Sequence, residues 1–373
     1  MSLKHCLTQS IHSIITYLNW KLFENREKNL LSLNSLPNKK ADGEDEYLEY
    51  WKPVFKLGTP MAYRLYSEYC GKTKFLVSEN CASKIDLVLN PSRYIGYYQD
   101  KNNFDKIVGL KNMPGTILRI IDCEFVDRDY NSVNSISEEL FESLIENEGN
   151  LILKQSVDSD SGRSVMLFHK TGNGHYYKGS VKLTLEFFKE SGKNVILQRA
   201  IEQHPDISIF NNSSVNTLRI VTYKSVTTNE VHILSTVIRI GANGSEIDNM
   251  HAGGRMVRVD MNGKLAKTAF DQYGRRYSEH NGIRFDSEEY TIPNFDKAIE
   301  LAKKIAEEVR PLRLIQHDIS IDRNGNPVCI EFNVRGFPCW VAQFTGTPAF
   351  GEFTDEIRNY VMSQPEPKYK LNV

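Results

Sequence analysis

The sequence lacks the features that mark membrane-spanning, secreted and nucleic-acid-binding proteins. It has no apolar run of about 18 residues or more, so no transmembrane helix is expected. Its N-terminus does not show the basic-then-apolar layout of a secretory signal. The formal net charge is only -1, which argues against nucleic acid or a membrane surface as the main partner. We therefore expect a cytoplasmic protein.

Cysteine is scarce, and several catalytic motifs are missing. The 373 residues include 6 cysteines, none of them in a Cys-x-x-Cys pair. Zinc and a disulfide framework are therefore not expected, and a reducing compartment fits. The sequence also contains no Gly-x-Ser-x-Gly, His-Glu-x-x-His, Gly-x-Gly-x-x-Gly or Gly-x-x-x-x-Gly-Lys motif. Function must be sought in less common patterns.

The chain is long enough to form two or three folded units, and 40% of its residues are hydrophobic. Strand-like and helical patterns are interspersed without a regular βαβ rhythm, which favours an α+β fold. Ser137 is expected to cap a helix. Strands are expected at 116–121, 151–154, 164–169, 195–201, 218–223 and 231–240, and helices at 137–147, 295–309 and 353–362.

The N-terminal region has a different composition. Apolar residues at helical spacing predict an amphipathic helix that packs on the body of the protein. These residues are Ile11, Ile14, Ile15, Leu18 and Leu22. Residues 37–46 are polar and indicate an exposed loop or linker. Residues 47–98 are rich in Tyr, Trp and Leu, and we expect them to form a small mixed α/β unit.

The most informative stretch is 316–336, which predicts a β-hairpin. Two short runs of strand-forming residues flank a polar Asp-Arg-Asn-Gly-Asn turn. If Asp322 pairs with Pro327 across a four-residue loop, Asp318 lies opposite Glu331. The pattern therefore predicts two facing carboxylates.

A metal site is the chemical reason for such an arrangement. Side chains alternate along a strand, so Glu331 and Asn333 share a face, and a paired Asp318 joins them there. Facing carboxylates repel each other unless a cation bridges them, and oxygen ligands suit Mg²⁺. The alternative is an ordinary hairpin with acids that face solvent. The apolar neighbours of Glu331 argue against it, because burying an unpartnered acid is costly.

A second segment suits phosphate groups. Lys154 ends a strand and is followed by a loop of small residues that includes Ser161 and Gly162. The lysine offers a point charge, and the loop offers backbone N–H donors with little steric obstruction. A plain polar hairpin loop remains an equal alternative on this pattern alone.

Two further segments carry isolated polar residues. Arg219 is the only charge in a β-rich run, where it could form a structural ion pair or face anionic oxygens. Asn249 and His251 lie among small residues at 248–255, which suggests a loop over a ligand. A lone histidine is more often structural than catalytic, so His251 receives no catalytic role.

Taken in order, these segments resemble the ATP-grasp superfamily. The likeness is greatest to the sugar-transfer-associated ATP-grasp family and weaker to the alpha-L-glutamate ligases. It covers roughly residues 90–350 and rests on the agreement of several loose motifs. The matching motifs are Asp100-Lys101, Pro114-Gly115-Thr116, Lys154 with its loop, the strand Leu197–Glu202, Asn216–Arg219, Asn249–Gly254, and Asp318 with Glu331-x-Asn333.

The resemblance implies a role for each matching residue. Lys101, Lys154 and the loop residues Ser161 and Gly162 would contact ATP phosphates. The segment from Gln198 through Arg199 to Ile201 would present backbone groups to adenine, and Glu202 would hold the ribose. Asp318, Glu331 and Asn333 would bind Mg²⁺, with Mn²⁺ as a possible substitute. Asn249 and Arg219 would face the phosphates or the reacting carboxylate.

Two departures from the pattern affect the chemistry. Many carboxylate–amine ligases of this fold have an arginine two residues before the metal-binding Asp, and this chain has Gln316 there. The candidates to stabilise the oxyanion are therefore Arg219, Arg239 and Arg335. The expected adenine strand also carries Arg199 where the glutamate ligases commonly have an acid.

The resemblance implies an ATP-dependent ligase that joins a small-molecule carboxylate to an amine through an acyl phosphate. Family association implies a role in cell-surface polysaccharide or sugar-conjugate synthesis, and it includes sugar-linked molecules among the candidate substrates. One alternative is a kinase on the same fold. Another is a non-catalytic nucleotide-binding partner of a glycosyltransferase.

The expected architecture is an ATP-grasp fold, in which two α+β subdomains hold ATP between them. A smaller helical or mixed unit precedes them in the sequence. The boundaries expected from the sequence are 1–98 for this unit, 99–202 for the N-terminal subdomain, 203–363 for the C-terminal subdomain and 364–373 for a tail.

Overall fold

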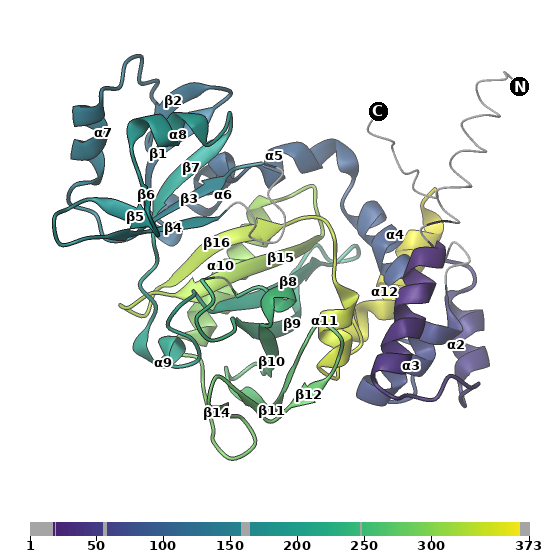
Figure 1. Ribbon diagram of the computed structural model, residues 1–373. Helices are drawn as coiled ribbons and strands as arrows, with labels where there is room; N and C mark the ends of the chain where they lie inside the picture. The colour runs from purple at the N-terminus through teal and green to yellow at the C-terminus, as the bar shows by residue number, and fades with distance from the viewer. Residues whose placement is uncertain (1–17, 19, 55–57, 158–164, 247, 366–373) are drawn as a thin grey trace, which may run out of the picture.

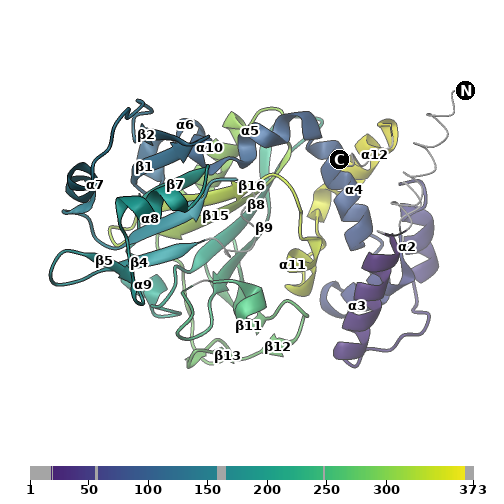
Figure 2. The same ribbon diagram turned by 45° about the horizontal axis from the view of Figure 1, so that its top comes forward.

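The computed structural model describes residue 18 and residues 20–54, 58–157, 165–246 and 248–365. Three groups of elements lie side by side: an N-terminal set of helices, a small sheet and a large sheet (Figures 1 and 2). The large sheet lies between the other two groups in both views. The architecture is α+β, as the interspersed pattern predicted.

The N-terminal group is helical rather than mixed. The described residues of 47–98 contain helices and no strand, so the expected mixed unit is corrected to a helical one. Side-chain caps fix two of the helix starts: Thr59 accepts from the Ala62 N–H, and Ser78 from the Cys81 N–H. The helices are residues 20–33, α2 Glu44–Trp51, α3 Pro60–Cys70, α4 Glu79–Leu89, α5 Ile95–Gln99 and α6 Phe104–Val108.

The predicted N-terminal amphipathic helix is only partly within the described residues. Ile11, Ile14 and Ile15 lie outside them. Leu18 and Leu22 are helical, but they are 53% and 67% exposed. Packing of this apolar face on the body is therefore wrong for these two leucines.

The small sheet has the strand order β2-β1-β7-β3-β4-β5-β6. Its core, from Ile117 to Leu197, is made only of residues within this part of the chain. Ser137 caps α7 by accepting from the Leu140 N–H, as predicted. The strands are β1 Thr116–Ile121, β2 Glu124–Asp127, β3 Leu151–Gln155, β4 Met166–Lys170, β5 Tyr176–Lys178, β6 Val181–Lys182 and β7 Val195–Arg199, and the helices are α7 Glu138–Ile145 and α8 Leu185–Glu190.

The large sheet has the order β12-β11-β10-β9-β8-β15-β16, with antiparallel neighbours throughout. The strands are β8 Thr217–Lys224, β9 Val231–Ile240, β10 Arg255–Val259, β11 Leu265–Phe270, β12 Arg276–Tyr277, β15 Leu314–Ile321 and β16 Pro327–Asn333. A separate pair is formed by β13 Glu279–His280 and β14 Ile283–Arg284. The other helices are α9 Pro205–Ser208, α10 Phe295–Glu308, α11 Cys339–Phe344 and α12 Thr354–Ser363.

The two faces of the large sheet have different roles. Helix α10 buries its apolar stripe, including Ala298, Ala302 and Ile305, against one face. Part of the other face packs into a core shared with α2–α4, α11 and α12. The rest of that face looks toward the small sheet and carries the polar residues described next. The N-terminal helices thus share one core with the large sheet.

Candidate active site

The β15–β16 hairpin brings the predicted acidic residues together. Asp318 pairs with Glu331 and Gln316 with Asn333, so all four side chains share one face. The predicted pairing of Asp318 with Glu331 is confirmed, but the route to it differs. Ile321, not Asp322, pairs with Pro327, which lengthens the loop by one residue.

A β-bulge corrects for this longer loop. The ladder shifts between Asp318 and Ile319, where Ile330 is the extra residue on β16. Without the bulge, a regular ladder from Ile321 and Pro327 would place Asp318 opposite Ile330. The extra residue restores Glu331 to that position, and Ile330 itself lines the cavity.

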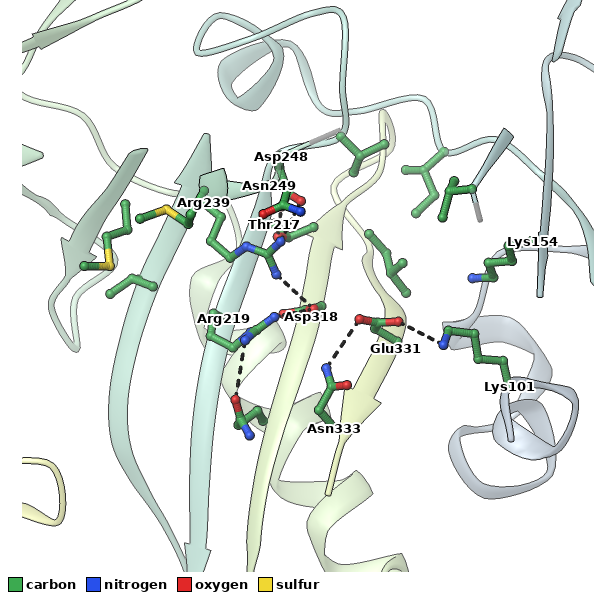
Figure 3. Close-up of a pocket in the computed structure, with 18 of the residues that line it drawn as sticks. Lys101, Lys154, Thr217, Arg219, Arg239, Asp248, Asn249, Asp318, Glu331 and Asn333 are labelled. Carbon is green, nitrogen blue, oxygen red and sulfur yellow. Dashed lines mark hydrogen bonds and ion pairs between the residues drawn. The ribbon is translucent and has the colours of Figure 1, made fainter. Parts of the chain in front are cut away.

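Two arginines from neighbouring strands enclose Asp318 (Figure 3). Arg219 on β8 donates to both carboxylate oxygens, over 2.5 and 2.8 Å. Arg239 on β9 donates to Asp318 Oδ2 over 3.1 Å. Burial would raise the pKa of Asp318, but the two guanidiniums outweigh it and hold the pKa below its ordinary value. Asp318 is therefore a carboxylate at neutral pH.

A second acid, Asp248, which is partly buried, holds Arg239 in place. Asp248 Oδ1 accepts from Arg239 over 2.8 Å, and its other oxygen accepts from the Thr217 hydroxyl. Burial disfavours the Arg239 charge, yet Asp248 and Asp318 together raise the pKa of Arg239 above its usual range. Sequence reasoning gave no role to Asp248 or Thr217. The only signal was the position of Asp248 next to Asn249, in the loop singled out as a ligand cover.

The predicted lysines face this acidic pair from the direction of the small sheet. Lys101 Nζ lies 3.4 Å from Glu331 Oε2. Lys154 is the last but one residue of β3 and is only 6% exposed, and its ammonium has no hydrogen-bond or ion-pair partner among the described residues. Burial, followed by the charge of Lys101, lowers the pKa of Lys154 to about 8. An unpaired buried ammonium calls for an anionic ligand.

Four residues were predicted to contact adenine or ribose: Gln198, Arg199, Ile201 and Glu202. Three of them, Gln198, Arg199 and Ile201, line the cavity. The backbone N–H of Arg199 already donates to Gly115, and its guanidinium pairs with Glu148. The side-chain oxygen of Gln198 is buried without a hydrogen-bond partner among the described residues.

Glu202 does not reach the cavity. Its carboxylate accepts from Arg323 over 2.6 Å, and both side chains are largely exposed. Strand β7 ends at Arg199, so side-chain alternation does not continue to Glu202. The contact of Glu202 with a ribose stays a prediction, and in this structure its carboxylate is directed to Arg323 instead.

The remaining predicted residues have different positions. Asn249 lines the cavity, and its side chain accepts from the His251 N–H, which starts a short helical turn at Met250–Ala252. Arg335 lies on the cavity wall, but its guanidinium is directed away, to the Asp86 carbonyl and the Ser92 hydroxyl. Ser161 and Gly162 lie outside the described residues.

The cavity between the two sheets has a volume of about 490 Å³, within the usual range for ligand pockets. Its lining contains six lysine and arginine side chains and four acidic ones. They are Lys101, Lys154, Arg199, Arg219, Arg239 and Arg335, with Glu246, Asp248, Asp318 and Glu331. The excess of positive charge and the unpaired Lys154 ammonium fit a polyphosphate. The Gln198 oxygen, which has no hydrogen-bond partner among the described residues, fits a nucleobase that can donate a hydrogen bond.

The donor set for a metal is small and rich in oxygen. Within the part of the chain that the structure describes, no group of three or more His, Cys, Asp or Glu side chains is placed to hold a metal ion. The candidate set is the two carboxylates of Asp318 and Glu331 with the Asn333 amide. The Asn333 amide nitrogen donates to Glu331 Oε1 over 3.4 Å, which leaves its oxygen available to a hard cation.

One lysine on a small antiparallel sheet and another just before that sheet face a carboxylate pair on a larger sheet across a cavity, and this arrangement is that of an ATP-grasp fold. The chain belongs to the sugar-transfer associated ATP-grasp family, whose profile matches residues 82–358. Both the superfamily and the family suggested by the sequence motifs are confirmed. No curated protein matches the chain in sequence. None of the helices in the described part is long and apolar enough to cross a membrane.

Several solved structures resemble the chain at low sequence identity. The biotin carboxylase domain of Hydrogenobacter thermophilus 2-oxoglutarate carboxylase, in complex with MgADP, ADP and bicarbonate, is 10% identical over 72% of this chain and 46% of its own, with a TM-score of 0.41. N5-carboxyaminoimidazole synthetase from Staphylococcus aureus, complexed with ADP, is 12% identical over 67% and 50%, with a TM-score of 0.37. L-amino acid ligase from Bacillus licheniformis is 11% identical over 64% and 40%, with a TM-score of 0.32. The chain spans about half the length of these structures.

Proposed function

We propose that this protein is an ATP- and Mg²⁺-dependent ligase that joins a carboxylate to an amine through an acyl phosphate. One observation carries the proposal: the unpaired, buried Lys154 faces the Asp318–Glu331 pair across a cavity with excess positive charge. Membership in an ATP-grasp family supports the same reaction class.

The chain's own residues divide the work of binding ATP. Lys101 and Lys154 would hold the phosphates as point charges. The buried Gln198 oxygen would accept a hydrogen bond from the adenine amino group, between the apolar side chains of Ile152 and Ile201. Asn249, in the loop above the cavity, would close over the phosphates, and Ser161 and Gly162 remain predicted phosphate contacts.

Glu331, Asn333 and Asp318 are the residues that would hold Mg²⁺, and Mn²⁺ would suit the same oxygen donors. The ion would neutralise charge on the β- and γ-phosphate oxygens. Glu331 and Asn333 are the more accessible donors, because both oxygens of Asp318 already accept from arginines. The rest of the catalytic contribution comes from positioning and electrostatics.

The arginine pair would guide the reaction in two steps. In the first, a carboxylate oxygen attacks the γ-phosphorus, the bond to the β–γ bridging oxygen breaks, and ADP leaves. In the second, an amine nitrogen attacks the acyl carbon, the carbon–oxygen bond to phosphate breaks, and phosphate leaves while nitrogen loses a proton. Arg219 and Arg239 would orient the carboxylate and stabilise the developing oxyanion, a role that Gln316 cannot fill because its amide is neutral.

Of the three predicted arginines, Arg335 is the weakest candidate, because its guanidinium donates to Asp86 and Ser92, whereas Arg219 and Arg239 lie directly beside Asp318. The family description supports placing the reaction in cell-surface polysaccharide or sugar-conjugate synthesis. A ligase that consumes ATP would work in the cytoplasm, where ATP is made.

Trapping with hydroxylamine tests the reaction class. The purified chain, ATP, Mg²⁺ and a panel of carboxylic acids should give ADP, phosphate and the acid's hydroxamate. A kinase would give ADP and a stable phosphorylated acceptor without hydroxamate. A non-catalytic nucleotide-binding protein would bind ATP, measured by calorimetry, with no turnover for any acid. Either result would overturn the ligase proposal.

A further inference from the structure

The cavity continues beyond the arginine pair to an apolar wall. Met256 on β10 pairs with Arg239 on β9, so it lies on the side of the arginine pair that is away from β15 and β16. The lining side chains that make this wall are Val237, Met250, Met256, Pro338, Trp340 and Val341. They come from β9, β10, α11 and the loop before β10, so the wall belongs to the large sheet and its covering helices.

The shared core holds this wall in position. Val237 and Met256 are each 1% exposed and belong to the core that includes the N-terminal helices. Trp340 and Met250 are partly buried against the same core, and with Pro338 they are the more accessible members of the wall. Arg26, in the helix at 20–33, lies over the Trp340 ring, 5.8 Å from its centroid. The surface is thus formed before any ligand arrives.

The polar groups at this end of the cavity are mostly engaged within the protein. Arg335 donates to Asp86 and Ser92, away from the cavity. The Gln316 amide lies between Arg219 and the Arg335 carbonyl, over 3.4 Å to each. The arginine pair and Asp248 bind one another and Asp318, and the other charged or titratable side chains of the lining on this side are Glu246 and His251, in the loop that carries Met250. A substrate would meet charge at its reacting end and apolar surface along its body.

We propose, on the basis of the ligase function above, that the acid it activates has an apolar aliphatic or aromatic body and is not a sugar acid. A sugar acid carries a hydroxyl on nearly every carbon, and each hydroxyl would lose water without gaining a partner at this wall. An apolar body gains from leaving water, and methionines adapt to its shape. The amine substrate, and not the acid, would then be the sugar-linked molecule that the family's description implies.

The test compares two classes of acid with one trapping amine. The apolar probes are 4-methylpentanoate and 3-phenylpropanoate, and the polar probes are glucuronate and galacturonate. With ATP, Mg²⁺ and hydroxylamine, kcat/KM for hydroxamate formation should be at least about tenfold higher for the apolar acids. Equal or higher values for the uronates would overturn the proposal. No hydroxamate from either class would instead overturn the ligase function itself.

Variants locate the preference at the wall. Met250→Glu should lower kcat/KM for the apolar acids by at least about tenfold and leave the KM for ATP unchanged. Met261→Glu is the matched control, because Met261 is 63% exposed on the β10–β11 turn and does not line the cavity. Met250→Ala keeps the wall apolar but enlarges it, so the ratio of 3-phenylpropanoate to 4-methylpentanoate turnover should rise. Unchanged acid selectivity in both Met250 variants would refute the assignment.

Discussion

Replacing Lys154 with methionine should stabilise the nucleotide-free protein and weaken ATP binding. The side chain is 6% exposed and has no ion-pair partner among the described residues. Burial, then Lys101, lowers its pKa from 10.5 to about 8. That difference corresponds to a cost of about 3 kcal/mol for keeping the ammonium charged in the folded protein at pH 7. Methionine has a similar length and no charge, so Lys154→Met removes this cost.

The gain in stability should depend on pH in a defined direction. Below pH 8 the lysine is charged in both the folded and the unfolded protein, so the wild type bears the whole cost. Between pH 8 and 10.5 the folded protein binds fewer protons than the unfolded chain, so wild-type stability rises with pH. The advantage of Lys154→Met should therefore be about 3 kcal/mol at pH 7 and shrink toward pH 10.5.

Urea unfolding at several pH values measures the stability, and calorimetry at pH 7 measures ATP affinity. Loss of a charge-assisted phosphate contact should weaken ATP binding roughly 10- to 100-fold. Lys303→Met is the control, since Lys303 is exposed on α10 and away from the cavity, and it should change neither quantity. A variant less stable than the wild type at pH 7, or one with unchanged ATP affinity, would refute the reasoning.

Three further predictions concern acidic side chains. Glu331→Gln should lower the rate of ADP formation at least about 100-fold, because the variant loses a metal-binding charge. Its melting temperature should stay within a few degrees of the wild type, because glutamine has nearly the same shape as glutamate. Near-normal turnover would rule out the metal-binding role of Glu331. Asp248→Asn should lower kcat more than it raises the KM for ATP, because Arg239 loses a partner that fixes its position; a change confined to the KM for ATP would argue for a different role. Burial raises the pKa of Glu27 to about 8, so folded Glu27 binds more protons than the unfolded chain between pH 4.5 and 8. The free energy of unfolding of the wild type should therefore fall as pH rises across that window. In urea titrations, the stability of Glu27→Gln relative to the wild type should increase from pH 5 to pH 8. A stability difference that stays constant over this range would contradict the raised pKa of Glu27.

Short-range patterns in the sequence were sufficient to place the hairpin and its acids. The pairing of Asp318 with Glu331 followed from alternation and a turn, both of which act within about 15 residues. The predicted loop was one residue too short, and the bulge at Ile330 compensated for the error. A bulge leaves no clear mark in a sequence, because it depends on how the strand packs.

Long-range contacts were beyond such reasoning. Arg239 was only a candidate, since its approach to Asp318 depends on the registers of β8 with β9 and with β15. The link from Asp248 to Arg239 depends on the path of a loop. Glu202 lies outside the cavity lining, and β7 ends at Arg199, earlier than its pattern suggested. The division at residues 98 and 202 remains a prediction, although the core shared by α2–α4 and the large sheet ties the first unit to the third.

The buried side chain of Asn90, at the end of α4, has a consequence for motion. Its amide nitrogen donates to the carbonyls of Leu314 and Val334, and its oxygen accepts from the Arg313 and Leu314 N–H groups. The N-terminal helices are thereby fastened to both strands of the hairpin, so helices and large sheet should move as one rigid body. The small sheet has its own core and is free of this fastening. Closure on a nucleotide would then be a rigid-body rotation of the small sheet relative to the large one. That rotation would move Lys154 toward Asp318 and Glu331, while these two carboxylates keep their positions.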